Sequence, residues 1–371
     1  MTDRDTSDAL HARVLAHIEA FERGAPAPES FDRLACDIAR YQAQNVDGYA
    51  RLCAARGVDP SSATRAEDLP AVPAEAFKLA PVFALAPDDA GVTFRTSGTT
   101  IGARGTHLMR DARTYSKAAS AFGRAMLTRD LAPPLDILVL GASDAEAPDS
   151  SLAFMCGEFV RAWARGYAPE ETFFVRSGAI DVRGLRARVA ALRCARPATV
   201  LATSFALVHF LDALGTGALP LPPGSRIMQT GGYKGKSRVL SPTALRQAVA
   251  RAFGVELRAI VSEYGMTELS SQFWEATLVD PNARPGVYRE PPWARVVPVD
   301  PETLRPVPPG VEGVARIEDL ANVDSAFAVL AQDRVRRVDG GFELLGRVSG
   351  SPARGCSIAL DEILGADQSR P

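Results

Sequence analysis

A loop rich in threonine, serine and glycine carries the first residues of this chain that can bind a charged ligand. It lies between Arg95 and His107, and its hydroxyl groups and flexible backbone positions are Thr96, Ser97, Gly98, Thr99, Thr100 and Gly102. Glycine lets the backbone approach a ligand closely, and hydroxyl groups donate hydrogen bonds beside the peptide N–H groups. Such a loop can wrap phosphate oxygens, although its composition alone also fits a solvated turn.

A second glycine-rich stretch spans residues 229–237. It contains Gly231, Gly232 and Lys234, whose ammonium group can neutralise phosphate or carboxylate charge. Neither stretch has a common nucleotide fingerprint. The first loop lacks the G-x-G-x-x-G spacing, and in the second Thr230 stands where a P-loop needs its first glycine. A glycine-rich surface turn with lysines in water is the alternative interpretation.

A third stretch directly follows an apolar run that predicts a strand. It places an aromatic ring, a hydroxyl group and a carboxylate close together, at Tyr264, Gly265, Met266, Thr267 and Glu268. A carboxylate is the hard oxygen ligand that Mg²⁺ prefers. A turn with a buried tyrosine and a solvated glutamate is the alternative interpretation.

The elements that position these stretches alternate between strands and helices. Apolar residues at helical spacing predict helices, and short apolar runs predict buried strands. The expected helices cover residues 8–23, 31–41, 111–127, 184–194, 205–214 and 242–253, and the expected strands cover 135–140, 199–202, 226–229 and 257–261. This order predicts βαβ units, a largely parallel sheet and ligands beyond the strand C-termini. The first loop is expected to join a strand ending near Phe94 to the helix at 111–127.

The composition and the hydrophobic pattern of the sequence change after Pro281. The chain there becomes proline-rich and β-patterned, with Asp339-Gly-Gly341 as the expected turn of a hairpin. We therefore expect an α/β core with N-terminal helices over 1–280, a smaller β-rich subdomain over 281–363 and a flexible tail over 364–371.

Composition narrows the classes of function. The 371 residues are 46% hydrophobic with a formal net charge of −2, which gives no basic surface for sequence-independent nucleic-acid binding. No apolar run is long enough to cross a bilayer, and the acidic N-terminus is unlike a secretion signal, so we expect a cytoplasmic protein. Dispersed cysteines and histidines argue against a disulfide framework and a zinc site. The cysteines are Cys36, Cys53, Cys156, Cys194 and Cys356.

The order of the stretches resembles that of the adenylate-forming ligases, which join carboxylic acids to AMP. The segment from Thr96 to Gly102 resembles their phosphate loop, and the run from Tyr264 to Glu268 matches the residues that line adenine, phosphate and magnesium. The resemblance implies that Tyr264 stacks on the purine, that Thr267 bonds the α-phosphate and that Glu268 holds Mg²⁺. It also implies the N-terminal-type fold of these ligases, with layered, mostly parallel sheets, helices and a small β subdomain.

Two residues near the expected hairpin extend the resemblance. By position, Asp333 matches an aspartate that holds the ribose hydroxyls, and Arg347 matches an arginine that meets the ribose or phosphate. ATP and Mg²⁺ are the cofactors that the resemblance implies.

Further segments narrow the resemblance to the acyl-protein synthetase (LuxE-type) family of bacterial fatty-acid reductase systems. The likeness runs from about residue 69 to 363 and includes Leu69-Pro-Ala-Val-Pro73, Phe77-Lys78, His107, Gly231 to Lys234, Asp319-Leu-Ala-Asn322 and Arg354-Gly-Cys-Ser357. Membership implies that a carboxylate attacks the α-phosphate of ATP to give acyl-AMP, and that a thiolate then takes the acyl group. Cys356 matches the acceptor cysteine, and Arg354 beside it would lower the pKa of the thiol. The resemblance implies catalytic roles for Cys356, Lys234, Glu268 and His107, and a fatty-acyl reductase as the partner.

The chain departs from the wider superfamily at its C-terminal end. Members usually end in a small mobile domain with a catalytic lysine, and the 24 residues after Arg347 are too few for such a domain. A lysine for adenylation would then come from Lys234, Lys78 or a partner. Two alternatives stay open: a ligase delivering an aryl or acyl group to coenzyme A or a carrier protein, with Cys356 structural, and a nucleotide-binding subunit without turnover.

Overall fold

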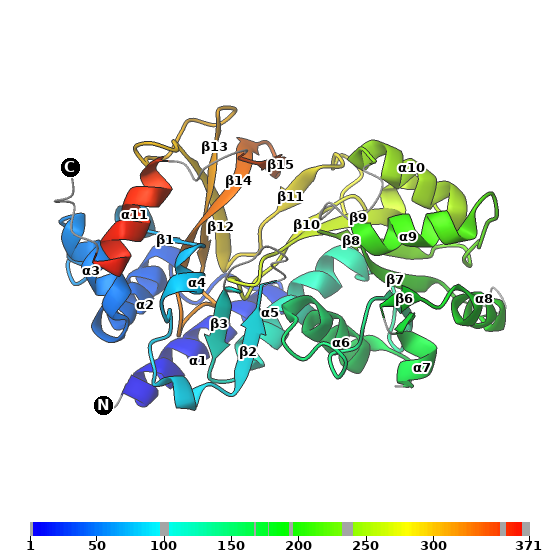
Figure 1. The fold of residues 1–371 in the computed structure, drawn as a ribbon, viewed down its shortest axis with the longest axis horizontal. Coiled ribbons are helices and arrows are strands. Elements are labelled where there is room, and N and C mark those ends of the chain that lie inside the picture. Colours follow the sequence, from blue (N-terminus) through cyan, green and yellow to red (C-terminus); the bar gives the residue numbers. More distant parts are fainter. Residues whose placement is uncertain are drawn as a thin grey trace. The chain divides into compact units, whose positions relative to one another are not determined.

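The structure, a computed structural model, describes residues 3–96, 104–166, 168–176, 178–192, 196–231, 240–348 and 354–365. The chain forms two compact units, each built from separate stretches of sequence (Figure 1). The first unit comprises Met1–Ala121, Met266–Gln272 and Arg289–Pro371, and the second comprises Phe122–Gly265 and Phe273–Tyr288. The boundary between a core over 1–280 and a subdomain over 281–363, which the change in composition suggested, stays a prediction.

The second unit is organised around a sheet whose strands are mostly parallel. Its strands lie in the order β10-β9-β8-β7-β4. The parallel strands are β4 (Asp136–Leu140), β7 (Ala198–Thr203), β8 (Arg226–Thr230) and β9 (Ile260–Tyr264), and β10 (Phe273–Glu275) pairs antiparallel with β9. The predicted parallel sheet is therefore confirmed. β9 begins later than the predicted strand because Leu257–Ala259 forms a 3₁₀ turn.

Helices cover both faces of this sheet (Figure 1). On one face α8 (Val182–Ala191), α9 (Ser204–Leu214) and α10 (Pro242–Phe253) share a hydrophobic core with alternate strand residues such as Leu138 and Val200. α6 (Ser151–Trp163) covers the other face. A small hairpin of β5 (Val175–Arg176) and β6 (Ala179–Ile180) follows the short helix α7 (Pro169–Thr172).

The sequence predicted the start of α10 and missed α6. As predicted, Pro242 opens α10 and the hydroxyl of Ser241 accepts a hydrogen bond from the Ala244 N–H at 3.2 Å. The buried residues of α6 share one face of the helix, so its helical pattern was present in the sequence and was overlooked. A second signal is Ser150, whose hydroxyl accepts from the Ala153 N–H at 3.2 Å.

The first unit combines N-terminal helices with an antiparallel sheet. The helices are α1 (Asp3–Glu22), α2 (Phe31–Asn45) and α3 (Asp47–Ala55), followed by the short helices η1 (Ala66–Asp68), α4 (Ala76–Leu79) and η2 (Pro87–Asp89). The antiparallel strands are β12 (Ala294–Val299), β13 (Glu312–Asp319), β14 (Ala328–Val338) and β15 (Gly341–Arg347), while β1 (Val72–Pro73) pairs parallel with β14. The predicted hairpin is β14–β15. β11 (Val287–Arg289) lies where the chain passes from the second unit into the first.

The Ser/Thr/Gly loop does not join a strand to a helix, so that expectation was wrong. The loop connects β2 (Val92–Arg95) to β3 (Thr106–Met109), which pair antiparallel, and α5 (Arg113–Leu127) comes only after β3. In β3 the buried His107 and Met109 alternate with half-buried neighbours, which is the period of a strand. A run this short is hard to distinguish from loop by periodicity.

The last described helix, α11 (Arg354–Leu364), packs against α3. Arg51 Nε donates to the carbonyl oxygen of Ile363 at 2.8 Å, and Arg56 Nε lies 2.7 Å from the carboxylate of Glu362. Gly48 leaves room for Ile363, because a Cβ at Gly48 would come within 3.0 Å of the Ile363 side chain. These contacts hold the C-terminal half of α11.

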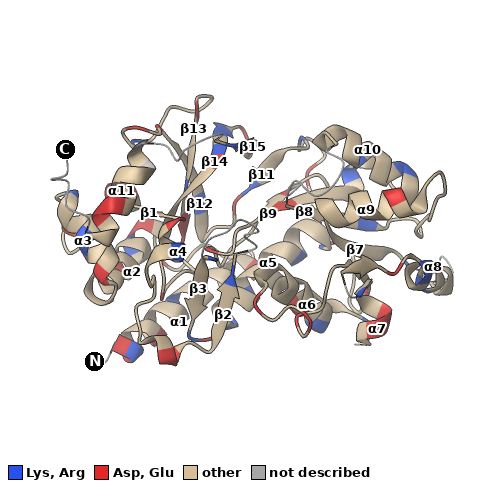
Figure 2. Ribbon diagram, in the orientation of Figure 1, with Lys and Arg blue, Asp and Glu red and all other residues tan. Residues whose placement is uncertain are grey.

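Charged residues of both signs are interspersed along the elements of each unit (Figure 2). In the part of the chain that the structure describes, no helix is long and apolar enough to span a membrane.

Candidate active site

The third motif stretch ends in a loop, residues 266–272, that we call the motif loop. Asp319, at the end of β13, is fully buried and holds this loop with both of its carboxylate oxygens. It accepts hydrogen bonds from the N–H groups of Ser270 and Ser271 at 2.9 and 2.8 Å, and from the Ser271 hydroxyl at 2.6 Å. A carboxylate that accepts several backbone hydrogen bonds is a rigid anchor, so this half of the motif loop has a defined path.

Asn322 fixes the middle of the motif loop. Its side-chain amide donates to the carbonyl oxygens of Glu268 at 2.9 Å and Ala326 at 3.0 Å, and its side-chain oxygen accepts from the Ser270 hydroxyl at 2.6 Å. Asp319 and Asn322 belong to the segment Asp319-Leu-Ala-Asn322, for which the sequence suggested a family likeness and no role. The structure brings that segment to the backbone of the motif loop.

His107 holds the start of the motif loop. Its Nδ1 lies 2.7 Å from the carbonyl oxygen of Thr267, and its Nε2 lies 2.9 Å from the hydroxyl oxygen of Ser325. Phe77 packs edge-on against the imidazole, with ring centroids 5.7 Å apart. Burial lowers the pKa of His107 to about 4, against the opposing effect of the Thr267 carbonyl, so the ring is neutral at physiological pH.

Glu268 is the buried carboxyl group of the motif loop. Burial raises its pKa to about 7, while the charges of Arg347 and Lys78 act in the opposite direction. Among the residues that the structure describes, no three of His, Cys, Asp and Glu are placed to hold a metal ion together. Mg²⁺ in nucleotide sites usually takes one or two carboxylates and completes its shell with phosphate and water oxygens. The Glu268 carboxylate therefore fits an ion that arrives with a nucleotide.

Asp333 and Arg347 lie opposite each other across the β14–β15 hairpin. Arg347 Nε donates to a carboxylate oxygen of Asp333 at 3.2 Å, with Asp333 buried and Arg347 largely exposed. The structure thus brings together two residues that the sequence selected only by their positions on either side of the predicted turn.

Thr96 lies at the base of the Ser/Thr/Gly loop, where its side chain supports the loop itself. The Thr96 N–H donates to the carbonyl oxygen of Gly105 at 2.8 Å, and the Thr96 hydroxyl accepts from the Gly105 N–H at 2.9 Å. A Cβ on Gly105 would come within 2.9 Å of Thr96 Cγ2, so glycine is needed here.

Several predicted site residues lie outside the described part of the chain. They are Ser97, Gly98, Thr99, Thr100, Gly102, Gly232 and Lys234, together with Cys194. The backbone of Cys356 belongs to the first turn of α11, and its side chain lies outside the described part. The other cysteines, Cys36, Cys53 and Cys156, are free and buried, as expected for core residues.

In the second unit, the predicted residues follow strands β8 and β9. Gly231 comes directly after β8 with a φ of +69°, a conformation that favours glycine. Tyr264 ends β9, and its ring lies 6.0 Å from that of Phe273 and 6.1 Å from that of Tyr288 by centroids. Gly265 follows and is exposed, whereas Met266 and Thr267, in the first unit, are half-buried.

Sequence reasoning missed Glu263, the residue before Tyr264. Its side chain is 5% exposed and accepts a hydrogen bond from the hydroxyl of Thr230. Burial raises the pKa of Glu263 to about 7, so this carboxyl keeps its proton to a higher pH than a solvated glutamate does. The sequence offered no signal for this state, since a glutamate in a strand is usually solvated.

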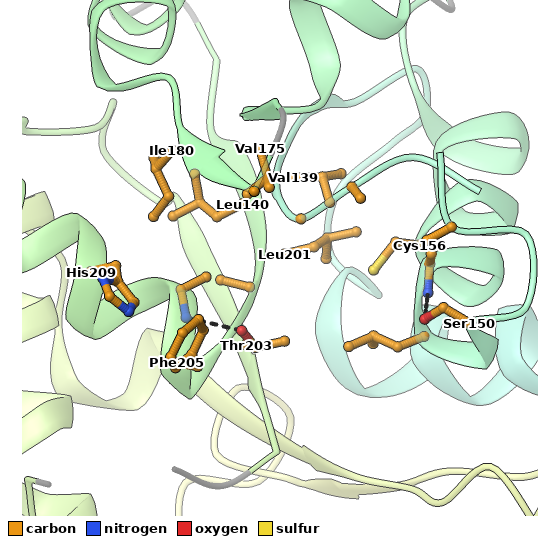
Figure 3. A pocket seen from close by; sticks show the side chains of 18 of the residues that line it. Val139, Leu140, Ser150, Cys156, Val175, Ile180, Leu201, Thr203, Phe205 and His209 are labelled. Carbon is orange, nitrogen blue, oxygen red and sulfur yellow. Dashed lines mark hydrogen bonds between the residues drawn. The ribbon is translucent and has the colours of Figure 1, made fainter. Parts of the chain in front are cut away.

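A cavity of about 600 Å³ opens at the C-terminal ends of β4, β7 and β8 (Figure 3). Its walls come from these strand ends, from α6 and α9 and from the β5–β6 hairpin. In Figure 3 Ser150 and Cys156 lie on the α6 side, and Phe205 and His209 lie on the α9 side. Among the described residues that line the cavity, none is Asp, Glu, Lys or Arg.

The polar groups in this cavity wall are few and mostly engaged. The hydroxyl of Thr203 accepts from the Ala206 N–H at 3.0 Å, as the cap of α9, and that of Ser150 caps α6. Burial, together with the nearby charge of Glu263, raises the pKa of Cys156 to about 12, so its thiol is neutral. The wall therefore suits an uncharged, apolar ligand at the carboxyl edge of the sheet, where the sequence predicted that ligands gather.

Comparisons with known proteins agree with this arrangement. The family model "Acyl-protein synthetase, LuxE" matches residues 31–365, and a comparison with curated proteins found no match. A 2-hydroxyisobutyryl-CoA ligase in the postadenylation state is similar at 15% identity with a TM-score of 0.61, covering 85% of this chain and 68% of the ligase. An open conformation of the same ligase, with 2-HIB-AMP and CoA, reaches 0.61 at 16% identity, covering 86% of this chain and 70% of that one.

A further similar structure is ATP-bound MatB from Rhodopseudomonas palustris, at 16% identity and a TM-score of 0.51, covering 86% of this chain and 62% of MatB. Likenesses at this level of identity show the fold, which is the α/β fold expected from the sequence. The family match extends over most of the chain. This protein therefore belongs to the LuxE family of acyl-protein synthetases and has the fold of the adenylate-forming ligases.

Proposed function

We propose that this protein activates a fatty or related carboxylic acid as acyl-AMP and passes the acyl group through Cys356 to a partner protein such as a fatty-acyl reductase. Family membership supports the adenylation step. The observation that favours a fatty acid is the cavity, because no Asp, Glu, Lys or Arg is among its described lining residues. The cavity lies at the carboxyl edge of the same sheet as Gly231 and Tyr264. We also propose a cytoplasmic location, as the sequence led us to expect.

In the first step, a carboxylate oxygen of the acid attacks the α-phosphorus of ATP, and the bond to the pyrophosphate oxygen breaks. The hydroxyl of Thr267 would donate to an α-phosphate oxygen, and Tyr264 would stack on the adenine. Glu268 would hold Mg²⁺, which supplies positive charge beside the phosphoryl oxygens when bound. Asp333 would accept hydrogen bonds from the ribose hydroxyls, with Arg347 beside it.

In the second step, the thiolate of Cys356 attacks the acyl carbonyl carbon, the bond to the AMP oxygen breaks, and AMP leaves. The N-terminus of a helix carries partial positive charge and lowers the pKa of a cysteine placed there. Cys356 belongs to the first turn of α11, which supports a reactive thiolate at this position. A nucleophile of the partner protein would then take the acyl group by attack on the thioester carbonyl.

The cavity favours an acid with an uncharged tail. A tail that carries a second carboxylate or an ammonium group would need a buried counter-charge, and none of the described lining residues is Asp, Glu, Lys or Arg. Each methylene buried in such a wall contributes about 0.8 kcal/mol, so an aliphatic chain gains affinity with length until the cavity is full.

The test is the intact mass of the protein after incubation with ATP, Mg²⁺ and a panel of carboxylic acids, followed by hydroxylamine treatment. We expect an acyl adduct that hydroxylamine removes, that Cys356→Ala abolishes and that the buried-cysteine control Cys36→Ala retains. Pyrophosphate release without an adduct would mean that the acceptor is coenzyme A or a carrier protein. Absence of carboxylate-dependent pyrophosphate release would mean that the chain binds nucleotide without turnover.

A further inference from the structure

His107 makes two hydrogen bonds that together determine which ring nitrogen carries the proton. The Thr267 carbonyl oxygen can only accept, so Nδ1, 2.7 Å away, must be the protonated nitrogen. Nε2 is then the lone-pair nitrogen and accepts from the Ser325 hydroxyl at 2.9 Å. Both nitrogens are therefore occupied, and the imidazole has no free site at which to exchange a proton with a substrate.

The bond from Nδ1 acts on the peptide group that joins Thr267 to Glu268. Orientation of this peptide group sets the direction in which both side chains leave the backbone. Asn322 holds the next carbonyl along, that of Glu268, at 2.9 Å. Two successive carbonyl oxygens of the motif loop are thus fixed by side chains from β3 and from the β13–β14 connection.

Ser325 follows a segment, residues 322–324, that side chains of α1 and α2 hold by hydrogen bonds. The neighbouring Asp324 carboxylate accepts from Ser7 at 2.6 Å and lies 3.0 Å from His11 Nε2, both on α1. Gln42 of α2 donates to the carbonyl oxygens of Asn322 and Val323, both at 2.8 Å. The N-terminal helices therefore hold the backbone just before Ser325.

We propose that His107 is a positioning residue: held by Ser325 in its neutral Nδ1–H form, it fixes the Thr267–Glu268 peptide group so that the Thr267 hydroxyl and the Glu268 carboxylate meet the nucleotide. This role differs from acid–base catalysis, the other way in which a histidine acts at such a site. The kinetic test of this inference, pyrophosphate release, rests on the proposed function. The spectroscopic test, the ¹⁵N shifts of the ring, rests on the structure alone.

The kinetic test compares His107→Asn, His107→Gln and His107→Ala by acid-dependent pyrophosphate release. An asparagine amide can occupy the place of Nδ1 and donate to Thr267, whereas glutamine reaches the place of Nε2. We expect His107→Ala to lose roughly 10–100-fold in kcat, as for removal of groups that orient a ligand-binding side chain, and His107→Asn to recover most of it. The KM for the acid should stay within about two-fold of wild type, because the acid cavity is lined by other residues.

A matched control separates this role from general loss of stability. His17 on α1 is equally buried, and neither of its ring nitrogens has a hydrogen-bond partner in the described part of the chain. His17→Asn should leave kcat unchanged. Equal losses in His107→Asn and His107→Ala, or an acid limb of the pH profile that His107 variants remove, would overturn the positioning role in favour of acid–base catalysis.

A second readout does not depend on turnover. The ¹⁵N shifts of the His107 ring should show a protonated Nδ1 and an unprotonated Nε2, unchanged between about pH 5.5 and 8. Amide exchange in residues 266–272 should accelerate in His107→Ala and not in His107→Asn. A ring that titrates in this range or shows the other tautomer would overturn the inference. If wild type releases no pyrophosphate, the proposed function fails, and these two measurements still decide the role of His107.

Discussion

At the scale of single residues, Glu268 of the third motif stretch and Glu263, which precedes that stretch, differ in what surrounds them. Glu268 lies within reach of the positive charges of Arg347 and Lys78, whereas Glu263 accepts a hydrogen bond from the hydroxyl of Thr230 and, among the described residues, no cation lowers its pKa. A buried carboxyl with no cation beside it is stable only while it keeps its proton. Burial therefore disfavours the ionised form of the Glu263 carboxyl group.

Replacing Glu263 with glutamine should stabilise the protein in mildly alkaline solution. The pKa of Glu263 rises from 4.5 to about 7 on folding, so as pH increases between these values the unfolded chain loses a proton that the folded chain keeps. The stability that Glu263 contributes is fully present below pH 4.5, the pKa in the unfolded chain. It is lost as the pH rises through about 7, the pKa in the folded protein, by at most roughly 3 kcal/mol. Glutamine can still accept from Thr230 and does not ionise.

The measurement is thermal unfolding of wild type and Glu263→Gln at about pH 5 and pH 8. We expect a higher Tm for the variant at the higher pH and a smaller difference at the lower. Glu312→Gln, at an exposed glutamate paired with Arg334, is the control. A variant that is no more stable than wild type at the higher pH would show that Glu263 is ionised in the folded protein.

At the scale of elements, helix α1 is tied to the connection between β13 and β14 by the buried Asp324. Burial acts to raise the pKa of Asp324, but its partners outweigh this effect, and the pKa is lowered. These partners are His11, through its hydrogen bond and charge, Ser7, through its hydrogen bond, and Arg110, through its charge. Tyr41 of α2 also donates to this carboxylate, at 3.1 Å. α1 precedes residue 31, where the family match begins, yet it holds a segment that reaches the motif loop.

Removing the α1 partners of Asp324 should make the protein sensitive to acid. A carboxyl whose pKa is lowered on folding adds stability above its unfolded value, near 4, and this stability is lost as pH falls through the lower folded value. With His11→Ala and Ser7→Ala combined, the folded pKa rises, and a buried carboxylate that lacks partners costs about 1–3 kcal/mol. Acid unfolding followed by circular dichroism should therefore begin at a higher pH.

The control for this prediction is Arg4→Ala, on the same helix, where the contact with Asp89 is long and exposed. We expect Arg4→Ala to unfold at the same pH as wild type. An unchanged acid midpoint in the double variant would mean that Tyr41 and Arg110 suffice to hold Asp324.

At the scale of the whole molecule, the family's motifs are divided between the two compact units. Gly231, Tyr264 and the uncharged cavity belong to the second unit, whereas Glu268, Asp333 and the side chains that hold the motif loop belong to the first. The chain passes from one unit to the other inside the third motif stretch, between Gly265 and Met266. The cavity wall can therefore be altered in the second unit without changing Glu268, Asp333 or the motif loop.

Filling the cavity should shorten the preferred acid without impairing adenylation of short acids. Ala142, just after β4, is half-buried in the cavity wall. Ala142→Phe should exclude the distal part of a long tail, and loss of two buried methylenes corresponds to roughly 10-fold in kcat/KM. The measurement is pyrophosphate release across a series of aliphatic acids. Ala190→Phe, at an exposed site on α8 outside the cavity, is the control, and an unchanged length profile in Ala142→Phe would place the acid elsewhere.

Local patterns in the sequence were enough to predict the alternating elements, the parallel sheet and the β14–β15 hairpin. Periodicity and capping are properties of neighbouring residues, as the Ser241 cap of α10 shows. The ordered motifs also selected His107, Thr267, Glu268, Asp333 and Arg347 as candidates. For the short strand β3 the same patterns failed, because its 4 residues are too few to show a clear period. Helix α6 was missed although its buried residues share one face.

Only the tertiary structure decided how those candidates act. The partners of His107 lie 160 and 218 residues away in sequence, and the Ser270–Asn322 contact spans 52 residues. Hydrogen bonds over such separations depend on how elements pack, which no local pattern contains. The same holds for the proton of Glu263 and for the uncharged cavity, because burial is a property of the packed chain. The residue types come from the sequence, and their protonation states and partners come from the fold.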